Sequence, residues 1–105
     1  MIRTEGKKII MVEKEFGISL PIIITGATIS SNETIEFTIK KNDGTNLIEP
    51  KKYLNVENNT FDLMFSKEES VEMKPGTYFY SIDWYNGDIF LANIVKNELF
   101  VVEDR

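Results

Sequence analysis

Apolar and polar residues alternate along most of this chain, and turn-forming residues separate the alternating segments. The clearest segment covers residues 34–40, where Ile35, Phe37 and Ile39 are apolar and the residues between them are polar. Successive side chains of an extended chain point to opposite faces, so this segment predicts a strand with one buried face and one face in water. Such segments recur about every 8–12 residues, which is typical of an all-β sandwich or barrel.

The remaining strands follow from the same pattern. Earlier in the chain we expect strands over residues 9–12 and 16–25, and Pro21 interrupts the second one. Because proline cannot donate a ladder hydrogen bond, Pro21 indicates an edge strand, a bulge or a crossing between sheets. Later strands are expected over residues 46–50 with a continuation over 53–56, and over 61–65, 77–85, 89–95 and 98–102. The predicted fold is therefore an antiparallel β-sandwich of seven to eight strands.

Local motifs mark three of the connections. Asp43-Gly44 and Asn86-Gly87-Asp88 are hairpin turns, because these residue types tolerate positive φ. Ser66 and Glu69 have the spacing of a capping box, in which each side chain accepts a hydrogen bond from a free backbone amide. We therefore expect a single helical turn over residues 66–72.

A Pro-Gly corner precedes the aromatic segment. Pro75 fixes its own φ, and Gly76 can take the positive φ that a type II turn requires. Tyr78, two residues after the corner, resembles the tyrosine corner of immunoglobulin-like sandwiches, in which the hydroxyl bonds back to the preceding turn. At a spacing of two, one inward face would carry Tyr78, Tyr80, Ile82 and Trp84.

The same alternation places other large side chains on outer faces. Phe79 and Tyr85 would point away from the core, and Ile23 and Met64 would do so from their own strands. Contiguous apolar side chains on a surface often mark an interface, so these four residues are interface candidates. The alternative is that an N-terminal arm or a loop covers this second face.

The length of the chain indicates how many domains it forms, and its charge and apolar runs indicate which partners are excluded. A chain of 105 residues corresponds to one domain, 1–105, in which residues 1–8 could form a flexible arm and 103–105 a charged tail. The net charge of −5 gives no overall basic footprint for nucleic acid. No apolar run is long enough to span a membrane. We therefore expect neither nucleic acid nor a membrane as a partner.

Catalytic chemistry has few candidates in this sequence. His and Cys are absent, which excludes His-dependent triads, thiol nucleophiles and zinc sites of the usual kind. Asp83 and Asp88 flank a turn and could pair as two catalytic carboxylates or hold Ca²⁺. Alternatively, Asp83 decorates the outer face of its strand and Asp88 favours the turn. We expect no enzyme, cofactor or metal site.

The order of these segments resembles that of a known group of proteins. Residues 34–40, Asp43-Gly44, 61–63, 66–69 and 73–82 follow one another as in small immunoglobulin-like β-sandwich proteins of phage and prophage structural modules, including the N-terminal domain of baseplate upper proteins. The similarity covers roughly residues 16–102. It implies a non-enzymatic role in virion or tail assembly, through contacts with other structural proteins or with further copies of the chain.

Two function classes therefore remain. The resemblance implies a structural component located in the virion, or in the bacterial cytoplasm before assembly. The alternative is a carbohydrate-binding or adhesion module built on the same sandwich, in which exposed aromatic rings would stack on sugars. The sequence identifies neither a partner nor an oligomeric state.

Overall fold

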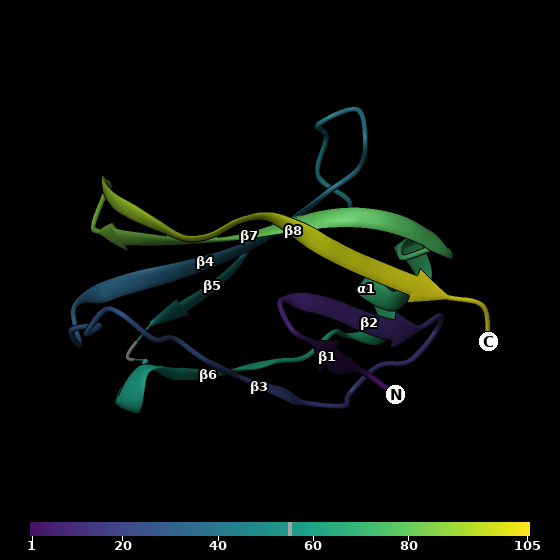
Figure 1. The fold of residues 1–105 in the computed structure, drawn as a ribbon, viewed down its shortest axis with the longest axis horizontal. Helices are drawn as coiled ribbons and strands as arrows, with labels where there is room; N and C mark the ends of the chain where they lie inside the picture. The colour runs from purple at the N-terminus through teal and green to yellow at the C-terminus, as the bar shows by residue number, and fades with distance from the viewer. Residues whose placement is uncertain (55) are drawn as a thin grey trace.

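The computed structural model describes residues 1–54 and 56–105, and within them eight strands form two sheets around one apolar core (Figure 1). The larger sheet has six strands in the order β1-β2-β8-β7-β4-β5, and the smaller sheet pairs β3 with β6. The all-β prediction is confirmed. The elements are β1 (Arg3–Glu5), β2 (Lys8–Val12), β3 (Leu20–Ile23), β4 (Glu33–Lys40), β5 (Lys51–Leu54), a 3₁₀ turn η1 (Glu57–Asn59), β6 (Thr60–Leu63), helix α1 (Lys67–Glu72), β7 (Gly76–Asn86) and β8 (Ile89–Glu103).

The large sheet is mixed rather than antiparallel throughout. β2 and β8 run parallel, with Ile9 opposite Phe100 and Val12 opposite Glu103, whereas the other paired strands are antiparallel. A parallel pair needs a long connection, and here most of the chain lies between the two strands. The expectation of an antiparallel sandwich is therefore wrong for this pair.

Aromatic side chains fill the space between the two sheets. The Phe37 ring stacks on Tyr80 with ring centroids 5.4 Å apart, and both rings lie within 6.5 Å of Phe100. Phe65, which follows β6, packs edge-on against Phe100 at 5.9 Å. As predicted, Ile35, Phe37 and Ile39 point inward and are almost completely buried.

Several strand boundaries differ from the expectation. β3 begins only at Leu20, and it is an edge strand that pairs with β6 alone, in agreement with the interpretation of Pro21. Residues 46–50 are not a strand: Asn46 forms an isolated bridge, and the return strand is β5. Within the expected continuation over 53–56, Asn55 lies outside the described residues.

The end of the chain also departs from the prediction. Residues 89–95 and 98–102 were expected to be two strands, but they belong to the single strand β8. Its pairing with β7 is irregular at three places, and Asn97 adopts a φ of 51° there. A bulge of this kind adds an unpaired residue and bends the strand, so one strand follows the curvature of the sheet without a turn.

The predicted helical turn is present. Helix α1 begins after Ser66, whose side chain accepts from the amide of Glu69, while the Glu69 carboxylate accepts from the amide of Ser66. The same carboxylate binds Lys51 at 2.9 Å, which joins α1 to β5. Burial acts to raise the pKa of Glu69, but the hydrogen bonds from Ser66 and Lys51 and the Lys51 charge outweigh it and lower the pKa below its usual value.

At the corner before β7, the predicted hydrogen bond of Tyr78 is present, but the predicted type II turn is not. The Tyr78 hydroxyl donates to the carbonyl of Lys74 at 2.6 Å, as a tyrosine corner requires. Gly76 has a φ of 156°, not the value of about 80° of a type II turn. Along β7, Tyr80 and Ile82 are buried and Tyr78 and Trp84 pack against the core, so the predicted inward face is confirmed.

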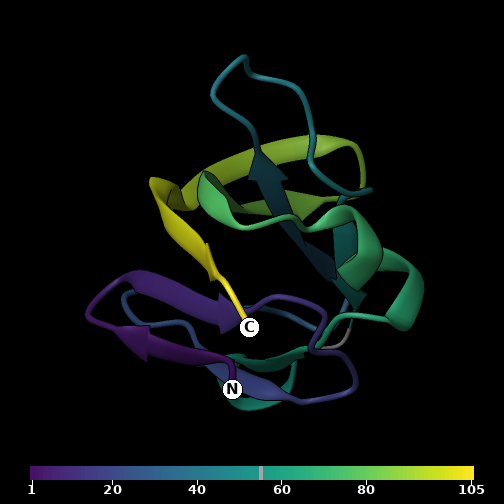
Figure 2. The same ribbon diagram turned by 90° about the vertical axis from the view of Figure 1, so that its right-hand side faces the viewer.

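Both chain ends contribute to the large sheet. Residues 1–8, suggested by the sequence as an arm, contain β1, and the Ile2 side chain is buried in the core. Glu103, in the suggested tail, still pairs with Val12. The N-terminal segment therefore extends the sheet at its edge and does not lie over its outer face (Figure 2).

Removal of the corner hydrogen bond tests its energetic role. We expect Tyr78→Phe to lower the free energy of unfolding by about 1 kcal/mol, the usual contribution of one hydrogen bond. Urea unfolding of the variant against the wild type measures the difference. Tyr85→Phe, at the other end of β7, is the control. Equal stability of Tyr78→Phe and the wild type would show that the corner does not depend on this bond.

Glu69 gives the fold a pH dependence. Because its pKa is lower in the folded state, the carboxylate stabilises the fold fully above its unfolded value of 4.5, and this contribution is lost as the pH falls through the lowered folded pKa. We therefore expect Glu69→Gln to be less stable than the wild type at neutral pH, and the two stabilities to converge in acid. Urea unfolding over a pH series measures this, with the exposed neighbour changed in Glu68→Gln as the control.

Candidate functional site

The end of the β7–β8 hairpin exposes an unusual amount of apolar surface. Its two-residue turn is made possible by Gly87, which has a φ of 61°. Immediately after the turn, Ile89 is 68% exposed, Phe90 50% and Leu91 41%. The Phe90 ring packs edge-on against Tyr85 with centroids 5.6 Å apart. We refer to Tyr85, Ile89, Phe90 and Leu91 as the hairpin end.

The apolar surface continues across the large sheet. The strand register places Leu54 opposite Thr34, Thr34 opposite Tyr85, and Tyr85 opposite Phe90. Residues in register across adjacent strands share one face, and here it is the outer face. Leu54 is 67% exposed. Four strands thus contribute to one row of largely apolar side chains.

A polar row runs beside the apolar one. In register, Lys52 faces Glu36, Glu36 faces Asp83, and Asp83 faces Asn93. Lys52 lies 4.0 Å from the Glu36 carboxylate, and the Asn93 amide donates to Asp83. The pKa of Tyr85 is raised by loss of contact with water and, to a smaller extent, by the negative charges of Glu36 and Asp83.

A shallow cavity lies where the two rows meet. Its volume is about 250 Å³. Its lining residues are Thr34, Glu36, Lys52, Tyr85, Gly87 and Asp88. The cavity therefore combines one aromatic ring with charged and hydrogen-bonding groups.

The structure does not bring the four interface candidates together. Phe79 and Tyr85 lie half-buried on the outer face of the large sheet, six residues apart along β7. Ile23 (69% exposed) and Met64 (47%) lie on the outer side of the small sheet. The two pairs are on opposite sides of the core, so they do not form one patch.

Sequence reasoning missed most of the hairpin end. Only Tyr85 was identified, whereas Ile89, Phe90 and Leu91 were assigned to an ordinary strand. The signal was present as a run of consecutive apolar residues beside an Asn-Gly turn. Alternation alone would bury every second residue of such a run, but the hairpin extends beyond the small sheet and leaves both of its sides uncovered (Figure 1).

Asp83 and Asp88, the two acidic residues considered for catalysis or Ca²⁺ binding, lie on β7 and in the turn that follows it. The Asp83 carboxylate accepts a hydrogen bond from Asn93 on the outer face, and Asp88 occupies the hairpin turn. Among residues 1–54 and 56–105, no group of three or more acidic residues is placed to hold a metal ion.

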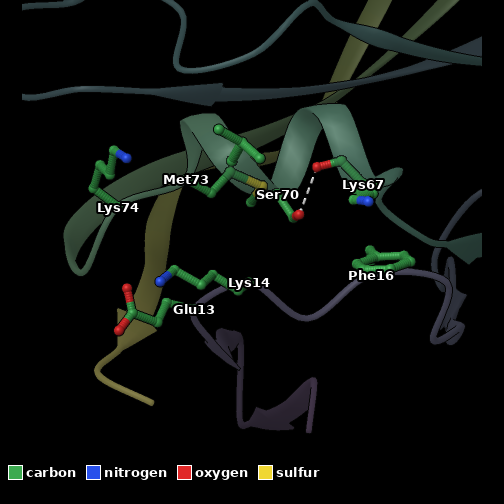
Figure 3. Close-up of a pocket in the computed structure, with 8 residues that line it drawn as sticks. Glu13, Lys14, Phe16, Lys67, Ser70, Met73 and Lys74 are labelled. Carbon is green, nitrogen blue, oxygen red and sulfur yellow. Dashed lines mark hydrogen bonds between the residues drawn. The ribbon is translucent and has the colours of Figure 1, made fainter.

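A second cavity lies beside α1, at the loop that follows β2 (Figure 3). Its volume is about 210 Å³. Phe16 on the loop and Val71 on α1 are half-exposed parts of its wall, whereas Met73 is buried. The Ser70 hydroxyl donates to the carbonyl of Lys67 at 2.7 Å, so it serves the helix. The lining of this α1 pocket consists of Glu13, Lys14, Phe16, Lys67, Ser70, Val71, Met73 and Lys74.

The hairpin end and the α1 pocket lie far apart. β7 begins at Gly76, shortly after α1, and ends at Asn86 beside the hairpin turn. Its eleven residues correspond to about 35 Å of extended chain. The longest dimension of the molecule is 38 Å, so the two features occupy opposite ends of it (Figure 1).

The chain was compared with protein-family models, curated proteins and solved structures. No protein-family model, curated protein or solved structure matches this chain. In the part of the chain that the structure describes, no helix has the length and apolar character needed to cross a membrane.

The two ends of β8 should differ sharply in their tolerance of substitution. Phe100 is fully buried, so we expect Phe100→Ala to cost about 3–5 kcal/mol of unfolding free energy. Phe90 contacts Tyr85 but is half exposed, so we expect Phe90→Ala to cost about 1 kcal/mol or less. Chemical denaturation of both variants checks this. A large loss for Phe90→Ala would mean that the hairpin end is a structural core rather than a free surface.

Proposed function

We propose that this protein is a non-enzymatic structural or interaction domain that acts through protein–protein contacts, as a tail or baseplate component of a phage or prophage virion. The exposed apolar row from Leu54 through Tyr85 to Phe90 supports the part of this proposal that concerns protein–protein contacts. The phage or prophage setting is what the resemblance over residues 16–102 implies. Soluble proteins rarely leave contiguous apolar surface uncovered, and such surface commonly marks an interaction site.

The composition of the row suits a protein interface. Tyr85 and Phe90 provide aromatic surface, and aromatic residues are enriched in the cores of interfaces. Leu54 extends the apolar area on the same face, and the polar row beside it can supply the rim. The partner would be another structural protein of the particle or a further copy of the chain.

The immunoglobulin-like assignment is part of the same proposal. Two features favour it: the corner hydrogen bond of Tyr78, and two sheets that enclose one core. Two features depart from it: the parallel pairing of β2 with β8, and a second sheet of two strands, β3 and β6.

A carbohydrate-binding module is the second candidate, and the shallow cavity beside Tyr85 favours it. A sugar ring could lie against the Tyr85 side chain while Glu36 and Lys52 bind its hydroxyl groups. Trp84 is not the stacking ring in this arrangement. It lies on the inner side of β7, and its indole N–H donates to Glu33 at 3.1 Å.

A paired binding experiment separates the two candidates. Light scattering would measure self-association, and pull-downs with proteins encoded by neighbouring genes would measure binding to partners. We expect association that is lost in the double variant with Leu54→Ser and Phe90→Ser and retained in Ile23→Ser. The Ile23→Ser control removes equally exposed apolar surface from the opposite side of the molecule.

A glycan array run on the same samples provides the contrary outcome. A monomer that binds none of these proteins but binds a glycan, with binding lost in Tyr85→Ala, would overturn the assembly role and support the carbohydrate module.

A further inference from the structure

We propose that copies of this chain associate head to tail, with the hairpin end of one copy inserted into the α1 pocket of the next. This inference rests on the proposed assembly function and specifies its partner as a second copy. Three independent features of the molecule support it: the size of the pocket, the charges around both surfaces, and their positions at opposite ends.

The pocket has the size and lining needed for an aromatic side chain. An apolar cavity of about 150 Å³ is large enough to bind benzene. The α1 pocket measures about 210 Å³, and the half-exposed side chains of Phe16 and Val71 provide apolar surface within it. Phe90 is a half-exposed ring at the end of a projecting hairpin. Its insertion would cover apolar surface on both copies.

The charges around the two surfaces are complementary. Lys14, Lys67 and Lys74 line the α1 pocket, against a single carboxylate from Glu13. The hairpin turn carries Asp88. Docking of the turn against the pocket would therefore place an acidic group beside a lining that contains three lysines, and opposite charges attract.

The polar row next to the hairpin end has the same sign. It contains Glu36 and Asp83 against one lysine, Lys52. A symmetric dimer through two hairpin ends would bring these acidic groups together in a chain whose net charge is already −5. Contact between the hairpin end and the lysine-lined pocket avoids this repulsion.

The positions of the two surfaces determine the kind of assembly. Because they occupy opposite ends of the 38 Å axis, each copy can use both surfaces at once (Figure 1). A contact between different surfaces of identical copies does not stop at two: it closes into a ring or extends as a filament. Each contact would centre on a single inserted side chain and would therefore be weak, so assembly should increase with protein concentration.

Sedimentation velocity over a concentration series tests this on the full chain. We expect the wild type to form species larger than a dimer, and both Phe90→Glu and Val71→Glu to sediment as monomers. Val71 is 54% exposed on α1, so its replacement should leave the fold intact, and circular dichroism checks this for both variants. Ile23→Glu is the matched control, and it should assemble as the wild type does.

Mixing the two variants gives the sharper result. The Phe90→Glu chain keeps an intact pocket, and the Val71→Glu chain keeps an intact hairpin end. An equimolar mixture should therefore form a heterodimer through one good contact and grow no further. A mixture that stays monomeric, or wild-type assembly that survives both substitutions, would overturn the inference.

One outcome separates this inference from the proposed function. A wild-type chain that is monomeric at every concentration, but binds another structural protein through the hairpin end, would overturn head-to-tail association and leave the assembly role standing. A monomer that binds glycans and no protein would overturn both.

Discussion

The packing of aromatic rings between the two sheets holds this structure together. Phe37 and Tyr80 belong to the large sheet, Phe65 follows a strand of the small one, and Phe100 contacts all three. Because Phe100 lies on β8, the same contacts also fix the strand that pairs with β2 at the N-terminal edge. Loss of one ring would leave a cavity shared by both sheets, which dense protein interiors tolerate poorly.

The hairpin end is better suited to contact with another protein than the edge strands β1, β3 and β5 are. The exposed edges carry features that discourage strand pairing: Pro21 on β3, Lys52 on β5, and Arg3 with Glu5 on β1. The hairpin end carries no such residues and exposes Ile89, Phe90 and Leu91. β7 connects it to the corner beside α1, and along this length β7 pairs with β4 on one side and β8 on the other.

The candidate site could be predicted only in part. Alternation correctly placed Tyr85 and Ile23 on the outer faces of their strands. It could not show that these two residues face opposite directions, since that depends on which sheet each strand joins. Nor could alternation identify Phe90 as exposed, because its exposure depends on how far the hairpin projects. It also could not predict that Phe16 lies beside α1, because that is a contact between distant segments of the chain.

Short stretches of the sequence are enough to predict the local structure: the alternating strands, the turn at Gly87, the capping box of α1 and the hydrogen bond of Tyr78. Each of these depends on residues within a few positions of one another, so a short stretch of chain contains all the necessary information. Three features are visible only in the folded chain: the parallel pairing of β2 with β8, the continuity of β8 through its bulges, and the placement of the hairpin end and the α1 pocket at opposite ends. These features follow from how the whole chain buries its apolar faces together, and no local pattern encodes that choice.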